Sequence, residues 1–142
     1  MPTILLATDG SEFGLRAADY VLRRAAQSRE PVDVHLLNVQ LAMAGVNVKI
    51  FIRQDSLDDH YREAGQAALA AVADRLRAGG LSPTLHIGVG DAAEVIVEFA
   101  HSTGASEIVM GAHGRGVLAD AVLGSVAQSV VRASPVPVVL VR

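Results

Sequence analysis

Short apolar runs alternate along this chain with stretches in which apolar residues recur every three or four positions. The first run, residues 4–7, reads Ile-Leu-Leu-Ala and ends at Asp9-Gly10-Ser11, which indicates a buried strand followed by a turn and a helix cap. Four further apolar runs predict strands at residues 32–39, 84–87, 107–110 and 136–141.

The stretches between these runs have the spacing of amphipathic helices. Asp91 and Glu94 form a capping box that opens one helix, and another is predicted at residues 125–133. The two longer stripes are Leu15, Ala18, Leu22 and Ala25, for a helix at residues 12–28, and Leu57, Tyr61, Ala64, Ala68, Val72 and Leu76, for a helix from the N-cap Ser56 to Gly79-Gly80. Residues 41–55 fit a strand, a loop or a helical turn, and this choice stays open.

Strands and helices therefore alternate from the start of the chain to its end. That order predicts an α/β fold, a doubly wound five-stranded parallel sheet with right-handed crossovers and helices on both faces. Neither a linker nor an internal repeat interrupts the pattern, so residues 1–142 are expected to form a single domain.

Composition narrows the class of protein. Hydrophobic residues make up 51% of the chain and aromatic residues only 4%, so the core must consist of Val, Leu, Ile and Ala, as in a covered parallel sheet. The net charge of −3 without a basic tract argues against nucleic-acid binding. Cysteine is absent, which excludes disulfides and thiolate sites. With no signal-peptide pattern and no apolar run long enough for a bilayer, the expectation is a cytoplasmic protein that does not enter membranes.

The candidate chemistry follows the strand at residues 107–110. Two residues separate Gly111 from Gly114, and nine residues separate Gly114 from Gly124-Ser125 at the start of the last helix. Glycines can adopt positive φ and allow close approach to a ligand, while a helix start offers unpaired N–H groups to phosphate. Arg115 adds a cation and Ser125 a hydroxyl. These residues indicate a phosphate-binding site without naming the nucleotide.

With this glycine motif, the opening segment Ile4 to Ser11 and the closing segment Pro135 to Val141, the chain resembles the universal stress protein family, specifically its ATP-binding branch. The resemblance implies the strand order 3-2-1-4-5, with a switch point between the first and fourth strands. It implies a nucleotide-dependent regulator of stress responses that binds ATP, with Mg²⁺ carried by the phosphates, and no catalytic residues or protein-held metal.

The resemblance also implies a set of site residues. Asp9 would contact the ribose and adenine side, backbone near Val39 would frame the base, and Met110, Gly111, Gly114, Gly124, Ser125 and Val126 would line the ribose and phosphates. Ala7, His113 and Arg115 complete the expected set. Ala112 and Ala127 stand where the family often has hydroxyl residues, so one or two phosphate hydrogen bonds are expected to be missing. A homodimer is expected through the edge strand formed by Val136, Val138, Val139, Leu140 and Val141.

Other interpretations compete with this one. Asp9 and Ser125 could serve only as helix caps, and His113 could act as a general base. Gly88-Val89-Gly90 before Ala93 matches a dinucleotide fingerprint in outline, but the implied strand order puts it at the sheet edge, away from the switch point. The alternative functions are an adenylyl-transfer or slow ATP-hydrolysing enzyme of the related superfamily and a chaperone-like protein that holds nucleotide structurally.

Overall fold

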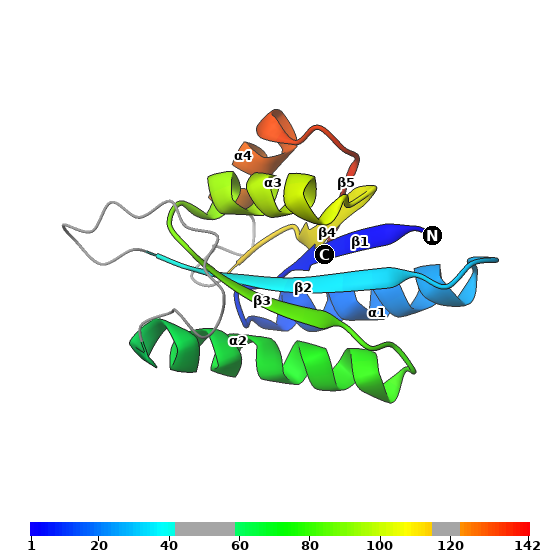
Figure 1. Cartoon of the computed structure of the whole chain (residues 1–142). Helices are drawn as coiled ribbons and strands as arrows, with labels where there is room; N and C mark the ends of the chain where they lie inside the picture. Colours follow the sequence, from blue (N-terminus) through cyan, green and yellow to red (C-terminus); the bar gives the residue numbers. More distant parts are fainter. Residues whose placement is uncertain (42–58, 115–122) are drawn as a thin grey trace.

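The computed structural model describes residues 1–41, 59–114 and 123–142. Its centre is a sheet in the order β3-β2-β1-β4-β5, in which every neighbouring pair is parallel (Figure 1). The strands are β1 (Thr3–Ala7), β2 (Asp33–Gln40), β3 (Thr84–Val89), β4 (Glu107–Gly111) and β5 (Val138–Val141). The predicted fold class and strand order are therefore confirmed.

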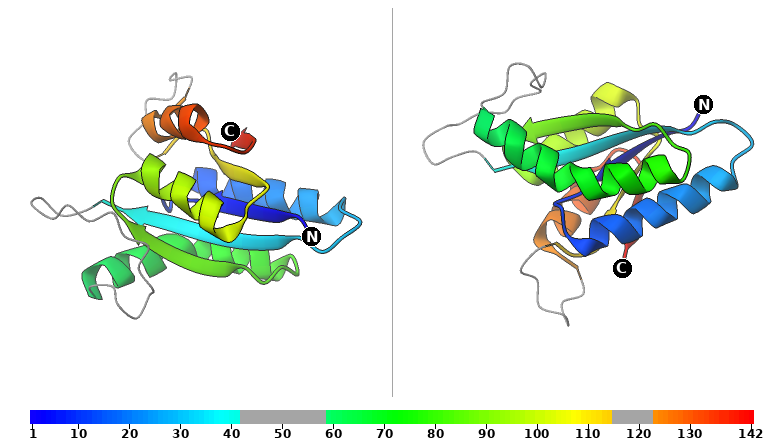
Figure 2. Two further views of the ribbon diagram at one scale, coloured as in Figure 1. Left: turned by 45° about the horizontal axis from the view of Figure 1, so that its top comes forward. Right: turned by 90° about the horizontal axis from the view of Figure 1, so that it is seen from below.

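Four helices cover the two faces of the sheet. They are α1 (Glu12–Ala26), α2 (Asp59–Ala78), α3 (Ala92–Thr103) and α4 (Ser125–Ala133). Helices α1 and α2 lie on one face, and α3 and α4 on the other, as Figures 1 and 2 show. Each face has its own apolar cluster, with Leu6 and Leu36 in the first and Leu5 and Leu37 in the second. Neighbouring strand residues thus point into opposite cores, as the period of two requires.

The predicted helical stripes are right in part: Tyr61, Val72, Leu76 and Ala18 are buried as predicted, other positions are one residue out of place, and Leu57 lies outside the described residues. In α2 the buried residues are Tyr61, Gly65, Leu69, Val72, Ala73 and Leu76, while Ala64 and Ala68 are only partly buried. The reason lies at Gly65, where an added Cβ would come within 2.7 Å of Ile87 on β3. A missing side chain lets the helix approach the sheet there, and apolarity alone does not reveal such a contact. Helix α1 likewise buries its small residues Gly14, Ala17 and Ala18, and Leu15 and Leu22 pack at the border of the core.

Element ends followed local chemistry. Helix α3 begins as predicted, with the Asp91 carboxylate accepting the Glu94 N–H at 3.1 Å, and ends at Gly104 in the left-handed conformation (φ 69°). Strand β5 begins at Val138 rather than at the predicted residue 136, because Pro137 has no N–H to donate. The proposed cap Ser56 and nearly all of the open segment 41–55 lie outside the described residues.

The centre of the sheet is where its connections change direction. β1 is bonded to β2 on one side and to β4 on the other, so the chain leaves β1 toward one face and leaves β4 toward the opposite face. Carboxyl ends of strands at such a switch point open into a crevice. None of the described helices is long and apolar enough to cross a membrane.

Candidate functional site

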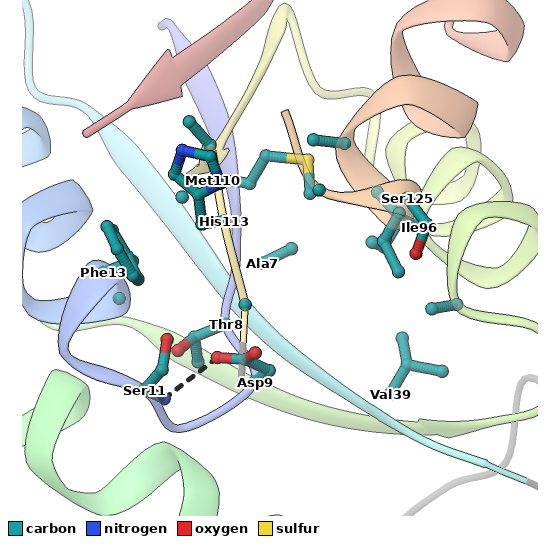
Figure 3. Close-up of a pocket in the computed structure, with 18 of the residues that line it drawn as sticks. Ala7, Thr8, Asp9, Ser11, Phe13, Val39, Ile96, Met110, His113 and Ser125 are labelled. Carbon is teal, nitrogen blue, oxygen red and sulfur yellow. Dashed lines mark hydrogen bonds between the residues drawn. The ribbon is translucent and has the colours of Figure 1, made fainter. Parts of the chain in front are cut away.

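A cavity of about 470 Å³ opens at this switch point. Its volume lies in the range of small-molecule sites. The carboxyl ends of β1, β2 and β4 and the first turns of α1, α3 and α4 surround it (Figure 3). Its described lining residues are Ala7, Thr8, Asp9, Ser11, Phe13, Gly14, Leu37, Val39, Gln40, Leu41, Ala92, Ile96, Met110, Gly111, Ala112, His113, Gly114, Gly124, Ser125, Val126 and Ala127. Every predicted site residue is among them except Arg115, which lies outside the described residues.

Asp9 is held at the floor of the cavity by a tight turn after β1. One carboxylate oxygen accepts the Ser11 N–H at 2.9 Å, shown as the dashed line in Figure 3. The Thr8 hydroxyl accepts the Gly10 N–H at 3.1 Å, and Gly10 takes φ 87°, a conformation that favours glycine. Ser11 occupies the N-cap position of α1. The interpretation of Asp9 as the helix cap is therefore wrong, although its carboxylate does support the turn.

At Gly111, the last residue of β4, and at Gly114 the missing side chain leaves space for neighbouring side chains. A Cβ on Gly114 would lie 2.5 Å from Oδ2 of Asp9, and a Cβ on Gly111 would lie 2.7 Å from Cβ of Phe13. Gly111, Gly114 and Gly124 do not have positive φ. These three glycines therefore do not use the positive φ that glycine allows, and the close approach of a ligand to their backbone stays a prediction.

The first turn of α4 presents an open helix end to the cavity. Gly124 is the N-cap residue, no side chain caps the turn, and no acidic residue lies in it. The Gly124 N–H donates to the Ala112 carbonyl at 2.8 Å, which ties the start of α4 to the chain leaving β4. Ser125 is the first residue inside the helix and not its cap, so the simple capping interpretation of Ser125 is wrong.

Two polar atoms at the cavity are buried without a hydrogen-bond partner, Oγ of Ser11 and Nδ1 of His113. The His113 ring packs against Phe13, with 5.4 Å between ring centroids. Buried polar atoms normally have a partner, so two of them in one cavity wall indicate capacity for a polar ligand. Among the described residues, no group of three His, Asp or Glu side chains is arranged to hold a metal ion.

Apolar side chains also line the cavity. Val39 and Ile96 lie on the side opposite Phe13 and Ser11 in Figure 3, where Ser125 lies beside Ile96. Ile96 and Ala92 come from the first turns of α3, and the sequence did not identify them, because apolar residues that line a cavity look the same as residues that fill a core. The expectation that this segment lies away from the crevice is only partly right: Gly88 and Gly90 do not line the cavity, but the helix that follows them does.

Ala112 and Ala127, the two positions where a hydroxyl residue was expected from the resemblance, both line the cavity. Ala112 is 1% exposed and its N–H donates to the Val141 carbonyl at 2.7 Å, while Ala127 is 2% exposed on the inner side of α4. Neither methyl group can donate a hydrogen bond. Any hydrogen bond from these two positions to a ligand would have to come from the backbone.

Comparison with known proteins agrees with this geometry. The chain is 30% identical over 141 residues to a universal stress protein from Thermus aquaticus, covering 99% of this chain and 98% of that protein. It is 28% identical to universal stress protein MJ0577 of Methanocaldococcus jannaschii over 128 residues, which cover 90% of this chain and 79% of the relative. The solved MJ0577 structure superposes with a TM-score of 0.79 over 99% of this chain and 94% of that one.

A second solved relative carries a ligand. A universal stress protein crystallised in complex with cAMP is 27% identical, with a TM-score of 0.71 over 99% of this chain and 96% of that chain. The sequence model of the universal stress protein family matches residues 1–142. On this evidence, the chain belongs to the universal stress protein family.

Proposed function

We propose that the protein binds ATP in the crevice between β1 and β4 and acts in the cytoplasm as a nucleotide-dependent regulator. The observation that carries this proposal is that one cavity combines glycines and an open helix end with apolar side chains. Gly114 and the first turn of α4 supply the former, and Val39 and Ile96 supply the latter. A nucleotide likewise combines phosphates with an apolar base.

The orientation that we propose for ATP matches these two kinds of lining residue. The base lies against Val39 and Ile96, the ribose reaches the Asp9 carboxylate, and the phosphates extend along Gly111 and Gly114 to the N-terminus of α4. Asp9 is the only acidic residue among the described lining residues, and no Lys or Arg is among them. Mg²⁺ would accompany the phosphates and neutralise part of their charge, with Arg115 as a further cation. The relative crystallised with cAMP supports an adenine nucleotide as the ligand.

A regulatory role is favoured over an enzymatic one. Phosphoryl transfer to water needs a positioned nucleophile and charge stabilisation on both sides of the γ-phosphate. The described wall offers His113, whose Nδ1 has no partner to orient it, and Asp9, which supports the turn before α1. We expect ATP turnover far below the roughly 1 per second at which ordinary enzymes begin. A faster rate that vanishes in His113→Ala would contradict this assignment.

Calorimetry with two ligands tests the binding proposal. Wild-type protein should bind Mg-ATP, and Asp9→Ala should weaken ATP by about tenfold while inorganic triphosphate changes little, because the carboxylate contacts the nucleoside end. Mass spectrometry of the nucleotide retained after gentle purification should find an adenine nucleotide. Absence of ATP binding, or equal loss of both ligands, would contradict the proposed orientation.

We propose further that the protein is a homodimer joined through β5. This strand is at the sheet edge. Two hydrogen bonds show which of its backbone groups face β4: the Ile108 N–H donates to the Pro137 carbonyl at 2.9 Å, and the Ala112 N–H donates to the Val141 carbonyl. Residues 137, 139 and 141 therefore face β4, which leaves the backbone groups of Val138 and Leu140 facing outward. A second β5 related by a two-fold axis would pair with them and remove the exposed edge.

Two prolines on neighbouring residues test the interface. Val138→Pro removes an outward N–H and should convert the dimer to monomer with little loss of stability, whereas Val139→Pro removes a bond to β4 and should lower stability. Light scattering and thermal unfolding measure the two effects. A wild-type monomer at micromolar concentration, or identical behaviour of the two variants, would refute the β5 interface.

A further inference from the structure

Thr8 and Asn38 are the two buried polar residues in the described part of the chain, and they contact each other beside the cavity. Asn38 is 2% exposed and Thr8 is 8% exposed. Asn38 lies on β2, and its Nδ2 donates to the main-chain carbonyl of Thr8 at 2.9 Å. Burying an amide costs free energy that an apolar side chain such as Leu36, two positions earlier on the same strand, does not incur. The hydrogen bonds of the Asn38 side chain are therefore the reason to expect Asn at this position.

The orientation of the Asn38 amide is fixed by its neighbours. A carbonyl oxygen can only accept, so the nitrogen end of Asn38 must face Thr8. The oxygen end then faces Gln40, whose Nε2 donates to Asn38 Oδ1 at 2.6 Å. Both ends of the buried amide are paired. The two hydrogen bonds run in one direction, from Gln40 to Asn38 to Thr8, because the backbone carbonyl of Thr8 can only accept.

The contact lies where the backbone ladder between β1 and β2 ends. The last paired residues are Ala7 and Leu37, and the Thr8 N–H still donates to the Leu37 carbonyl at 2.9 Å. After Thr8 the chain turns at Gly10 into α1. The Asn38 side chain thus adds a hydrogen bond at the position where β1 turns away from β2 and the crevice begins.

We propose that Asn38 is a positioning residue of the nucleotide site: by holding the Thr8 carbonyl it sets the plane of the Thr8–Asp9 peptide and so the placement of Asp9. This inference rests on the proposed function. The peptide is planar and trans, so the Asp9 N–H points opposite to the Thr8 carbonyl, away from β2 and toward the β4 side. Asn38 itself is not among the residues that line the cavity, so it would act through Thr8 and Asp9 without touching the ligand.

Two substitutions of Asn38 and one control separate positioning from general stability. Asn38→Leu removes both hydrogen bonds at similar volume and should weaken ATP by about tenfold, with triphosphate changed less than about twofold. Leu36→Val, in the same strand and also fully buried, loses a methylene without touching Thr8 and should leave both affinities unchanged. Equal weakening of ATP and triphosphate in Asn38→Leu, or wild-type affinity for both, would overturn the proposal.

Asn38→Asp adds a test that a purely structural role would not meet. A protonated Asp can donate to the Thr8 carbonyl, but an ionised one cannot. The ATP affinity of this variant relative to wild type should therefore fall as pH rises from about 5.5 to 8.5, since burial raises a carboxyl pKa into such a range. The relative affinity of Asn38→Leu should stay constant. A constant ratio in Asn38→Asp would contradict the need for a donor at position 38.

Hydrogen exchange of the free protein gives an answer that does not depend on ATP. In Asn38→Leu the amides of Gly10 and Ser11 should exchange about tenfold faster, because the turn after Thr8 loses its anchor, while those of Leu36→Val stay as in wild type. If Asn38→Leu fails to fold, Asn38→Asp above neutral pH serves for the same comparison. If the wild-type protein does not bind ATP, the proposed function is refuted, but the role of Asn38 in the turn is not. If exchange at Gly10 and Ser11 is unchanged in Asn38→Leu, the role of Asn38 is refuted, but the proposed function is not.

Discussion

Of the three helices that begin beside the cavity, α3 and α4 differ in the group that occupies the N-terminus. Helix α3 begins at Asp91, whose own carboxylate accepts the Glu94 N–H at 3.1 Å, and Glu94 adds a second acid in the first turn. Helix α4 begins at Gly124, with no capping side chain and no acid in its first turn. The first end is filled and negatively charged, and the second remains able to receive an anion.

The two segments looked alike in the sequence, since each follows a strand with spaced glycines. Their glycines have different tasks: a Cβ on Gly88 would meet the Val95 side chain at 2.5 Å, within the core, whereas a Cβ on Gly114 would meet Asp9. The α3 segment contributes an apolar wall through Ala92 and Ile96. Glycine spacing alone therefore does not identify a phosphate site, and the residue at the N-cap is the more informative signal.

The largest expected effect is at Gly114. Gly114→Val should abolish ATP binding, because its Cβ would displace the Asp9 carboxylate and fill the space next to the α4 end. The domain should stay folded, as the position needs no positive φ. Gly88→Ala is the matched change at the other segment, and overpacking there should cost about 1–3 kcal/mol of stability with ATP affinity retained. Calorimetry and denaturant unfolding measure both, and ATP binding by folded Gly114→Val would refute the site.

Gly124→Asp should make α4 resemble α3. The new side chain has room, since the Cβ would lie 3.5 Å from its nearest neighbour, and φ −70°, ψ 160° suits an N-cap Asp. We expect ATP to weaken about 100-fold, or ~2.7 kcal/mol, because the carboxylate occupies the N–H groups and repels phosphate. Gly124→Asn, a neutral cap, should lose less. Equal losses in the two variants would mean that charge at this end is unimportant.

The reverse change at α3 should affect stability and not binding. Asp91→Ala removes the cap and should cost about 1 kcal/mol of unfolding free energy, while ATP affinity stays within about twofold. Thermal unfolding and calorimetry provide the two numbers. A marked change in ATP affinity would show that the acid of α3 also acts on the bound phosphates.

The smallest expected effect is the pH dependence of stability caused by His86, which packs against α3. Burial, and then the nearby charge of His35, hold the pKa of His86 below 6.5. His86 Nε2 lies 2.8 Å from His35 Nδ1, and the His86 ring packs against Phe99 of α3. On its other side, His35 Nε2 is within hydrogen-bond distance of the Asp33 carboxylate, at 3.0 Å. The unfolded chain therefore binds the proton more readily, so stability should fall as pH drops below about 6.5.

His86→Leu should reduce this fall, while His101→Leu, at an exposed position of α3, should not. Denaturant unfolding between pH 5 and 7.5 measures the slopes. ATP affinity should follow the same pH course in wild type and His86→Leu, since His86 does not line the cavity. A slope unchanged by His86→Leu would show that the histidine pair does not contribute.

The fold followed from local sequence more completely than the site did. Apolar runs and caps located the strands and α4 within a few residues, because strand burial and helix capping are local properties. Helix faces were harder, since Gly65 and Gly14 pack closely through side chains that they lack. The role of Asn38 was not predicted, because its partner Thr8 lies 30 residues away and the contact is to backbone. Phe13 and Ile96 have no sequence signal that separates a cavity wall from a core.

The direction of β5 determines what an assembled pair could contact. Because β5 runs parallel to the other strands, a two-fold pair would join two sheets whose strands point in opposite directions. The crevice of one protomer would then open at one pole of the assembly and that of its partner at the other. A single small target could touch the nucleotide of only one protomer at a time, whereas two targets could be held at opposite ends of such a pair.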